Sequence, residues 1–323
     1  MQFENNLKVP MASSFSQLTI IYFFACNIFI LLASARTCTS CYTSIFGFGD
    51  SLTDAGNLIH LYPPDRKPHM YFPPYGKTYF NRPTGRCSDG RLLIDLIGCK
   101  KFLESSLFLL GEFGGNDYTH SLLSGKNLND ILPIIPVVVQ SIASGAHELV
   151  ELGAKTIMVP SVLPFGCASS YLTYFESWNE DDYDEIGCLI WPNEFASYHN
   201  ELLQKELHRL RELHPHVNII YADYYNAAMQ LYRAPRRYGF LEGALVACCG
   251  GGGPYNFNIF ALCGIFPATS CEDPNQYVNW DGYHLTEAAY RWMTKSLLEG
   301  PFTYPPIKNL CPFGINEAQV SQI

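Results

Sequence analysis

Short apolar runs alternate with longer stretches of helical periodicity along this chain. Runs rich in Ile, Val and Phe are typical of buried β-strands, whereas apolar positions spaced three and four apart are typical of amphipathic helices. The runs predict strands at residues 44–48, 106–110, 155–160 and 217–222. The longer stretches predict helices at residues 89–97, 130–152, 194–213 and 286–298. Such alternation predicts a parallel sheet with helices on both faces, in one large α/β domain.

Individual side chains add detail to the predicted helices. Asp89 and Asp130 open the first two helical stretches, and aspartate is a favoured N-cap residue. In the third stretch, large side chains recur at helical spacing and are expected on one buried face: Phe195, Tyr198, Leu202 and Leu210.

Residues 1–35 have the features of a secretory signal peptide. Lys8 precedes an apolar run at residues 18–33, and an Ala-Ser-Ala cleavage site follows. The run is short for a membrane span and is interrupted by Asn27, which favours a cleaved signal over an uncleaved anchor. We therefore expect residues 36–323 to be the mature domain, secreted to the extracellular space without a stable membrane anchor.

Charge and cysteine content restrict the class of protein further. A formal net charge of −9 argues against a nucleic-acid partner, whose binding needs clustered Lys and Arg. Twelve cysteines in an exported chain predict disulfides. One of them, Cys26, lies inside the signal peptide, so the mature domain holds an odd number and at least one thiol lacks an intrachain partner.

Two features resemble ligand sites without meeting their requirements. His208, His214 and His216 lie near a predicted helix end, but no Cys or acidic residue has the spacing that would complete a metal shell. The glycine run in "CGGGGPYN" is not followed by the Lys-Ser/Thr pair of a phosphate-binding loop, so it indicates a tight loop beside a disulfide. We therefore expect neither a phosphate-binding loop nor a histidine metal site at these two places.

Three separate segments carry the residue types that serine-dependent ester hydrolysis requires. Ser51 follows the first predicted strand, and the carboxyl ends of parallel strands are where ligands bind in open α/β folds. Asp281 and His284 are three residues apart, a spacing that lets the carboxylate reach Nδ1 and leaves Nε2 for a serine. Asn116, after the second predicted strand, can donate its amide to an oxyanion. Taken alone, each segment fits an ordinary turn or helix start equally well.

Taken in order, these segments resemble the plant branch of the GDSL esterase/lipase family, within the SGNH hydrolase superfamily. The resemblance covers nearly all of the mature chain, and its details are most similar to the subgroup of alkaloid and sinapine-type esterases. It rests on the motifs "FGDSLTDAGN", "RPTGRCSDGR", "FLLGEFGGNDY", "VLPFGCASSYLT", "ACCGGGGPYN" and "YVNWDGYHLTEAAYRW".

The resemblance implies a fold, an activity and a set of site residues. The fold would be a three-layer α/β/α sandwich of the SGNH, flavodoxin-like kind, with five parallel strands in the family. Ser51 would be the nucleophile, His284 the base and Asp281 the acid that orients it, with Asn116 and the Ser51 backbone N–H as oxyanion donors. The substrates would be small-molecule esters of lipids, acetylated metabolites or phenolic acids, hydrolysed without metal or cofactor.

One block of the family pattern is missing from this chain. Family members carry, between the "SDGR" helix and the strand before Gly-x-Asn-Asp, a further strand that ends in a glycine of the "NFAxxGAT" kind. Here the helical stretch runs through "CKKFLES" almost directly into the strand at residues 106–110. We therefore expect one strand–helix unit and one oxyanion donor to be absent between about residues 98 and 106. An alternatively spliced or mispredicted product of an esterase gene would have this form.

Three functional classes remain open from the sequence. The first is a secreted carboxylic-ester hydrolase. The second is a catalytically impaired or inactive variant, or a relative that only binds ligand, because losing a sheet strand is serious against a total stability of about 5–15 kcal/mol. The third is an acyltransferase, which would form the same acyl-serine and pass the acyl group to an alcohol.

Overall fold

The computed structural model describes residues 44–56, 58, 62–63, 66–97 and 106–310. These residues build a five-stranded sheet in the order β1-β2-β3-β4-β9. The first four strands are parallel, as predicted, whereas β9 is an unpredicted strand that pairs antiparallel with β4. The strands are β1 Ser44–Phe48, β2 Ser106–Leu110, β3 Thr156–Pro160, β4 Asn218–Ala222 and β9 Thr303–Tyr304.

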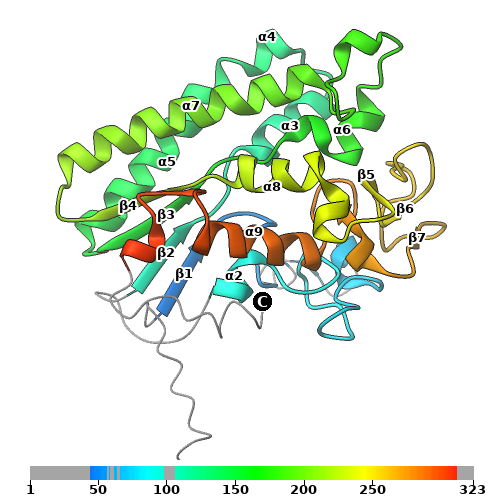
Figure 1. The fold of residues 1–323 in the computed structure, drawn as a ribbon, viewed down its shortest axis with the longest axis horizontal. Helices are drawn as coiled ribbons and strands as arrows, with labels where there is room; N and C mark the ends of the chain where they lie inside the picture. The colour runs from blue at the N-terminus through cyan, green and yellow to red at the C-terminus, as the bar shows by residue number, and fades with distance from the viewer. Residues whose placement is uncertain (1–43, 57, 59–61, 64–65, 98–105, 311–323) are drawn as a thin grey trace, which may run out of the picture. The chain divides into compact units, whose positions relative to one another are not determined.

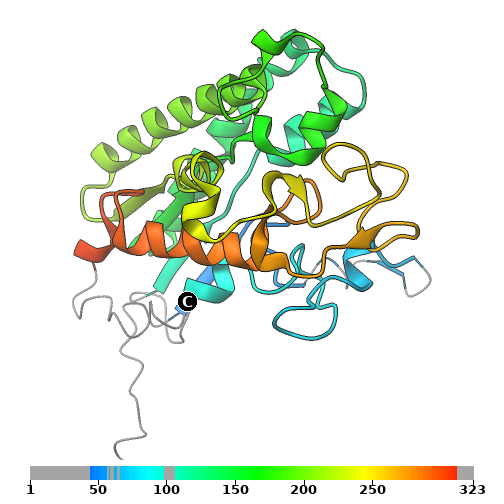
Figure 2. The same cartoon turned by 45° about the vertical axis from the view of Figure 1, so that its right-hand side comes forward.

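Helices cover both faces of this sheet, which confirms the three-layer α/β/α sandwich (Figure 1). Alternate strand residues point to opposite faces, so Phe108 and Ile219 join one core cluster while Leu107 and Ile220 join the other. One layer contains α3 Gly115–Leu123, α4 Leu128–Ile131, α5 Ile134–Glu151, α6 Ser169–Tyr174 and α7 Ile190–Leu213. The other contains α2 Leu93–Ile97, α8 Tyr224–Arg233 and α9 Glu287–Glu299 (Figure 2).

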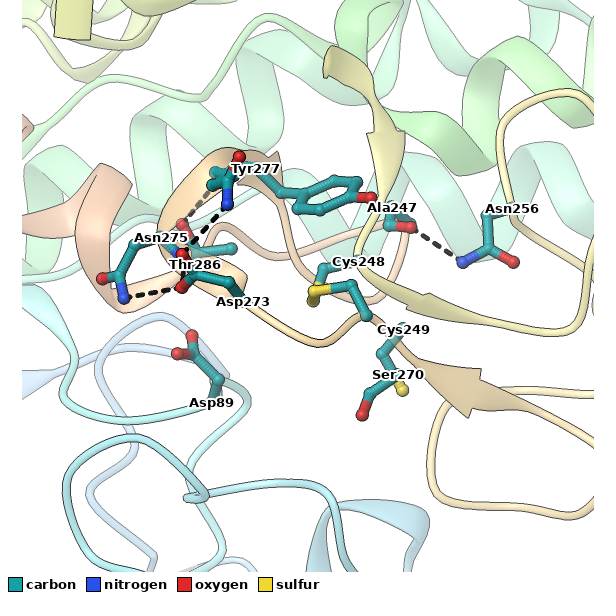
Figure 3. The surroundings of a disulfide bond; sticks show 12 residues. Asp89, Ala247, Cys248, Cys249, Asn256, Ser270, Asp273, Asn275, Tyr277 and Thr286 are labelled. Carbon is teal, nitrogen blue, oxygen red and sulfur yellow. Dashed lines mark hydrogen bonds between the residues drawn. A yellow bond between two sulfur atoms is a disulfide. The ribbon is translucent and has the colours of Figure 1, made fainter. Parts of the chain in front are cut away.

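Two short two-stranded sheets and a cross-linked loop lie between α8 and α9 in the sequence. The disulfides Cys248–Cys271 and Cys249–Cys263 close this loop, and the Asn256 side chain donates to the Ala247 carbonyl at 2.8 Å (Figure 3). The glycine run therefore forms a tight loop beside disulfides, as predicted. The strands are β5 Gly243–Ala247 with β8 Tyr277–Asn279, and β6 Cys249–Gly250 with β7 Thr269–Ser270.

The predicted disulfides are confirmed within the described part of the chain. A third bridge, Cys167–Cys188, links the segment before α6 to the start of α7. Among the described residues, Cys87 is the free cysteine, and it is buried. The remaining mature cysteines lie outside the described residues: Cys38, Cys41, Cys99 and Cys311.

The single helix predicted over residues 130–152 is wrong at its start, where the structure has α4 followed by α5. The N-cap is Asn127 rather than Asp130, and the two side chains form a reciprocal capping box. Pro133 and Pro136 lack the N–H groups that a continuous helix needs, so the helix is interrupted between α4 and α5.

Two smaller corrections concern the other helices. Helix α2 begins four residues later than the predicted Asp89, because the Asp89 carboxylate accepts the backbone N–H of Glu287 on α9, at 2.8 Å. On α7, Phe195 and Leu210 are buried as predicted, but Tyr198 is 41% exposed. The last predicted helix is confirmed as α9, with Thr286 as its N-cap.

Strand β1 is the outermost strand of the described sheet. It pairs with β2 on one side, and no other described strand pairs with its second edge. Phe46 and Phe48 are 38% and 45% exposed, which is unusual for large apolar side chains in a strand of a covered sheet. The residues predicted to flank the missing block, 98–105, lie outside the described residues, as does the predicted signal peptide at residues 1–35.

One described segment, Leu128–Glu151, is long and apolar enough to cross a membrane by length and composition alone. In this fold it comprises α4 and α5, whose apolar side chains join the core cluster under α7. Of its most apolar stretch, 33% is buried in this fold.

Candidate active site

Ser51 lies in a tight turn at the carboxyl end of β1. The Asp50 carbonyl accepts the N–H of Thr53 at 3.0 Å, which turns the chain directly after the strand. Gly49 lets this turn lie against the next strand, because a Cβ there would be 3.1 Å from the Cα of Gly111 and 2.8 Å from the Thr53 hydroxyl. Ser51 is thereby held at the edge of the sheet where ligands bind in open α/β folds.

Asp281 and His284 lie in one turn between β8 and α9. The N–H groups of Tyr283 and His284 both donate to Asp281 Oδ1, at 3.1 and 3.0 Å. Gly282 has a φ of 100°, and a Cβ there would be 2.3 Å from the ring of Phe257, so the turn requires glycine. The turn brings the imidazole back to the carboxylate.

The structure brings these three predicted residues into one hydrogen-bonded chain. His284 Nε2 lies 2.7 Å from Ser51 Oγ, and His284 Nδ1 lies 2.9 Å from each carboxylate oxygen of Asp281. With the Nδ1 proton donated to Asp281, Nε2 is the nitrogen that can accept the proton of the Ser51 hydroxyl. This is the arrangement that activates a serine as a nucleophile.

Burial and charge act in opposite directions on the Asp281–His284 pair. Burial alone would lower the pKa of His284, but the charge of Asp281, the neighbouring Cys87 and the hydrogen bond of Asp281 together outweigh burial and raise it above its usual range. Burial alone would raise the pKa of Asp281, but the charge and hydrogen bond of His284 outweigh burial and lower it. Asp281 is therefore ionised, and it stabilises the imidazolium that forms when His284 takes a proton.

The "SDGR" segment fixes the start of α9, and with it the turn that carries His284. The Asp89 carboxylate accepts the backbone N–H of Glu287, and the Glu287 carboxylate pairs with the Arg91 guanidinium at 3.0 Å. Gly90 permits the contact, because a Cβ there would be 1.9 Å from a Glu287 oxygen. A motif from the first third of the sequence thus positions the turn that carries His284, near the end of the sequence.

Asn116 lies in the first turn of α3, next to Ser51 in the lining of one cavity. Its side-chain amide donates to Asp50 Oδ2 at 3.1 Å. Burial raises the pKa of Asp50. Through this hydrogen bond Asp50, directly before Ser51, orients the Asn116 amide. The sequence analysis did not predict this contact, although both residues lie inside the quoted motifs.

Two further polar residues at the site were also missed. The Tyr75 hydroxyl donates at 2.7 Å to Asp281 Oδ2, an oxygen that His284 Nδ1 also contacts. Glu112 is buried in the cavity wall, and burial together with the charge of Asp50 raises its pKa well above its usual range. Glu112 lies in a quoted motif, but Tyr75 lies in none.

The Ser51 hydroxyl faces a cavity of about 890 Å³. A pocket of this size with apolar walls and a few converging polar groups is the usual form of a small-molecule site. Its apolar lining includes Leu58, Met70, Leu123, Leu163, Phe165 and Tyr171.

Comparison with known proteins decides the family. Residues 104–297 match the family model of the GDSL-like lipase/acylhydrolases. A GDSL esterase/lipase of Arabidopsis thaliana is 37% identical, over 90% of this chain and 93% of the relative. The sinapine esterase of Brassica napus is 36% identical, over 93% of this chain and 96% of the relative. The chain belongs to the GDSL-like lipase/acylhydrolase family. It is a serine ester hydrolase by this relationship.

The GDSL relatives carry residues that this chain lacks. The alignment with the Arabidopsis thaliana protein runs over 366 positions, more than the 323 residues of the chain. The match to the family model begins at residue 104. Ser51 precedes the 98–105 segment and so lies outside the matched region. A block absent between α2 and β2 would produce both observations.

Proposed function

We propose that this protein hydrolyses carboxylic esters through an acyl-serine intermediate at Ser51. His284 Nε2 takes the hydroxyl proton as Ser51 Oγ attacks the ester carbonyl carbon, and Asp281 stabilises the resulting imidazolium. His284 then gives this proton to the leaving alkoxide as the ester C–O bond breaks, which releases the alcohol. The 2.7 Å contact between Ser51 Oγ and His284 Nε2 is the observation that supports this proposal most directly.

The second half-reaction uses the same groups with water. His284 takes a proton from water as the water oxygen attacks the acyl carbon, then returns a proton to Ser51 Oγ as the carboxylic acid leaves. In both half-reactions negative charge develops on the former carbonyl oxygen. The proposed donors to that oxygen are the Asn116 amide and the backbone N–H of Ser51.

The proposed substrates are esters of lipids or of acylated small metabolites. The cavity volume of about 890 Å³ admits a ligand of that size, and its walls suit an apolar acyl or aromatic group. Because one relative, in Brassica napus, is a sinapine esterase, sinapine is a reasonable first substrate to assay alongside short acyl esters of a chromogenic phenol.

Labelling with a fluorophosphonate probe tests the proposed nucleophile. The probe is expected to phosphonylate Ser51, because the imidazole at 2.7 Å removes its proton. In-gel fluorescence and peptide mass spectrometry should locate one modified residue, absent in Ser51→Ala. The control variant Ser124→Ala, at an exposed serine whose hydroxyl donates to the Ser121 carbonyl, should label like the unmodified protein. Labelling that persists in Ser51→Ala would assign the nucleophile elsewhere.

The acid limb of the pH–rate profile is expected to lie above pH 6.5, the ordinary pKa of histidine. His284 accepts a proton only when it is neutral, so kcat/KM should rise with pH through the raised pKa of His284. Measurement of kcat/KM on a substrate without ionisable groups checks this. In Asp281→Asn the acid limb should move to lower pH, because the charge that raises the pKa is gone; an unchanged limb would show that another group controls it.

We also propose that the protein is secreted after removal of residues 1–35. The three disulfides among the described residues fit an oxidising compartment. Amino-terminal sequencing of the native protein should give a first residue near Arg36. A native chain that still carries the apolar run at residues 18–33 would instead be membrane-anchored.

A further inference from the structure

We propose that His147, Glu151 and His214 form a binding site for a divalent transition metal ion, with zinc as the expected occupant. The sequence reasoning considered His214 together with His208 and His216 and found no acidic partner nearby in the sequence. The fold supplies partners from 67 residues away, on a different helix. The site lies apart from the Ser51 cavity and adds a ligand that the proposed ester hydrolysis does not need.

Each ligand is placed by a regular feature of the fold. His147 and Glu151 are four residues apart near the end of α5, so they lie on the same helix face. His214 is the C-cap of α7, and it leaves the helical conformation because Pro215 follows it. The imidazole of His214 is thereby directed at α5, against which α7 packs in the same core cluster.

The distances suit coordination after a small adjustment. His147 Nδ1 and His214 Nε2 face each other at 2.8 Å, and the three ligand atoms of the cluster all lie within 4.8 Å of one another. Ligand atoms around tetrahedral zinc at about 2.0–2.1 Å are separated by about 3.3 Å. The imidazoles would separate by about 0.5 Å, and Glu151 can move inward because its side chain is exposed.

Charge also favours a cation at this position. Two helices, α5 and α7, end there, and the carboxyl end of a helix carries partial negative charge. Glu151 adds a full negative charge. The nearest cation on α7, Arg211, is directed elsewhere, since its guanidinium donates to the carbonyls of Ile219 and Tyr304 at 2.7 and 2.9 Å. Two neutral imidazoles and one carboxylate are a ligand set typical of zinc.

The position within the sheet indicates a structural role for the ion. Helix α5 ends just before β3 and α7 ends just before β4, so the cluster lies at the edge where the parallel strands begin. Ser51 lies at the opposite edge, where they end. The ion would link the carboxyl ends of α5 and α7 and stabilise the fold without taking part in ester hydrolysis.

Zinc titration of the untagged full-length protein tests the proposal. The protein is stripped with a chelator, dialysed, and titrated with Zn²⁺ in competition with a chromophoric chelator. One Zn²⁺ per chain is expected, with an affinity at least about 100-fold higher than in His147→Gln or Glu151→Gln, since even an outer-shell partner changes metal affinity by about 10–100-fold. Zinc should also raise the melting temperature of the unmodified protein but not of these variants.

A matched control separates this site from adventitious binding. His208 and Glu212 form an exposed His–Glu pair with the same four-residue spacing on α7, their atoms 3.4 Å apart. His208→Gln should bind zinc as the unmodified protein does. The proposal is overturned if His147→Gln and Glu151→Gln keep full affinity, or if His208→Gln loses as much as they do. Glu151 is exposed, so its variant tests the site even if changes at the buried His214 impair folding, and none of these readouts depends on esterase activity.

Discussion

Replacing His284 with alanine is expected to reduce kcat for ester hydrolysis by about 10⁴–10⁶-fold, and Ser51→Ala should have an effect of the same size. Without the imidazole at 2.7 Å, the Ser51 hydroxyl keeps its proton and is a weak nucleophile at neutral pH. The double variant should be no slower than either single variant, because each change already removes the same activated group. Steady-state kinetics on a chromogenic ester would measure all three.

Asp281→Asn gives a more specific test of the same unit. It should keep the fold and lower kcat by about 10⁴-fold, because the amide no longer holds His284 in the tautomer with a proton on Nδ1. His208→Ala, at a 71% exposed histidine, is the matched control and should leave kcat unchanged. If the double variant of Ser51 and His284 instead loses the sum of the two single-variant free-energy losses, His284 has a structural role in its turn and no role in the reaction.

Insertion of the missing block is expected to improve both solubility and turnover. The segment between α2 and β2 of the Arabidopsis thaliana relative, placed between residues 98 and 106, should add a strand beside β1. That strand would pair with the second edge of β1 and shield Phe46 and Phe48, whose exposure promotes aggregation. It would also carry the glycine that the family pattern places at the oxyanion site, which is worth about 10²-fold or more in kcat.

The two readouts of this insertion report on separate losses. Solubility and melting temperature report on whether the second edge of β1 is paired, whereas kcat reports on whether the additional oxyanion donor is present. A Gly/Ser linker of equal length is the control, since it lengthens the chain without supplying a strand. If the unmodified chain already has the full activity of the relative, Asn116 and the Ser51 amide are sufficient donors, and the missing block has no catalytic role.

The four parallel strands were predictable because each is a short apolar run, so composition alone marks it. Strand β9 was not, because Thr303–Tyr304 is a two-residue segment without a periodic pattern. The start predicted at Asp89 was wrong because this side chain is used outside its own helix. It accepts from Glu287 on α9, and no local pattern indicates so distant a partner.

The candidate site was predictable to the extent that its chemistry is contained in short motifs. Ser51 and the Asp281–His284 pair each lie in one short motif, and the order of these motifs along the chain is what resembles the family pattern. Tyr75 reaches Asp281 from 206 residues away, and Glu112 is distinguished by its burial, and both are properties of the folded chain. The pairing of His147 with His214 likewise depends on how α5 and α7 pack. Hydrophobic periodicity predicts which face of each helix is buried, but not which residues of the two helices meet.

The distance in sequence between Ser51 and His284 affects when the serine becomes reactive. They are 233 residues apart, so the ribosome makes the nucleophile first and its base almost last. At about 5–20 residues per second, Ser51 exists for roughly 10–50 s before His284 is synthesised. The nascent chain therefore passes through most of its synthesis as an inert precursor, and a product of premature termination before His284 carries an ordinary, unreactive serine.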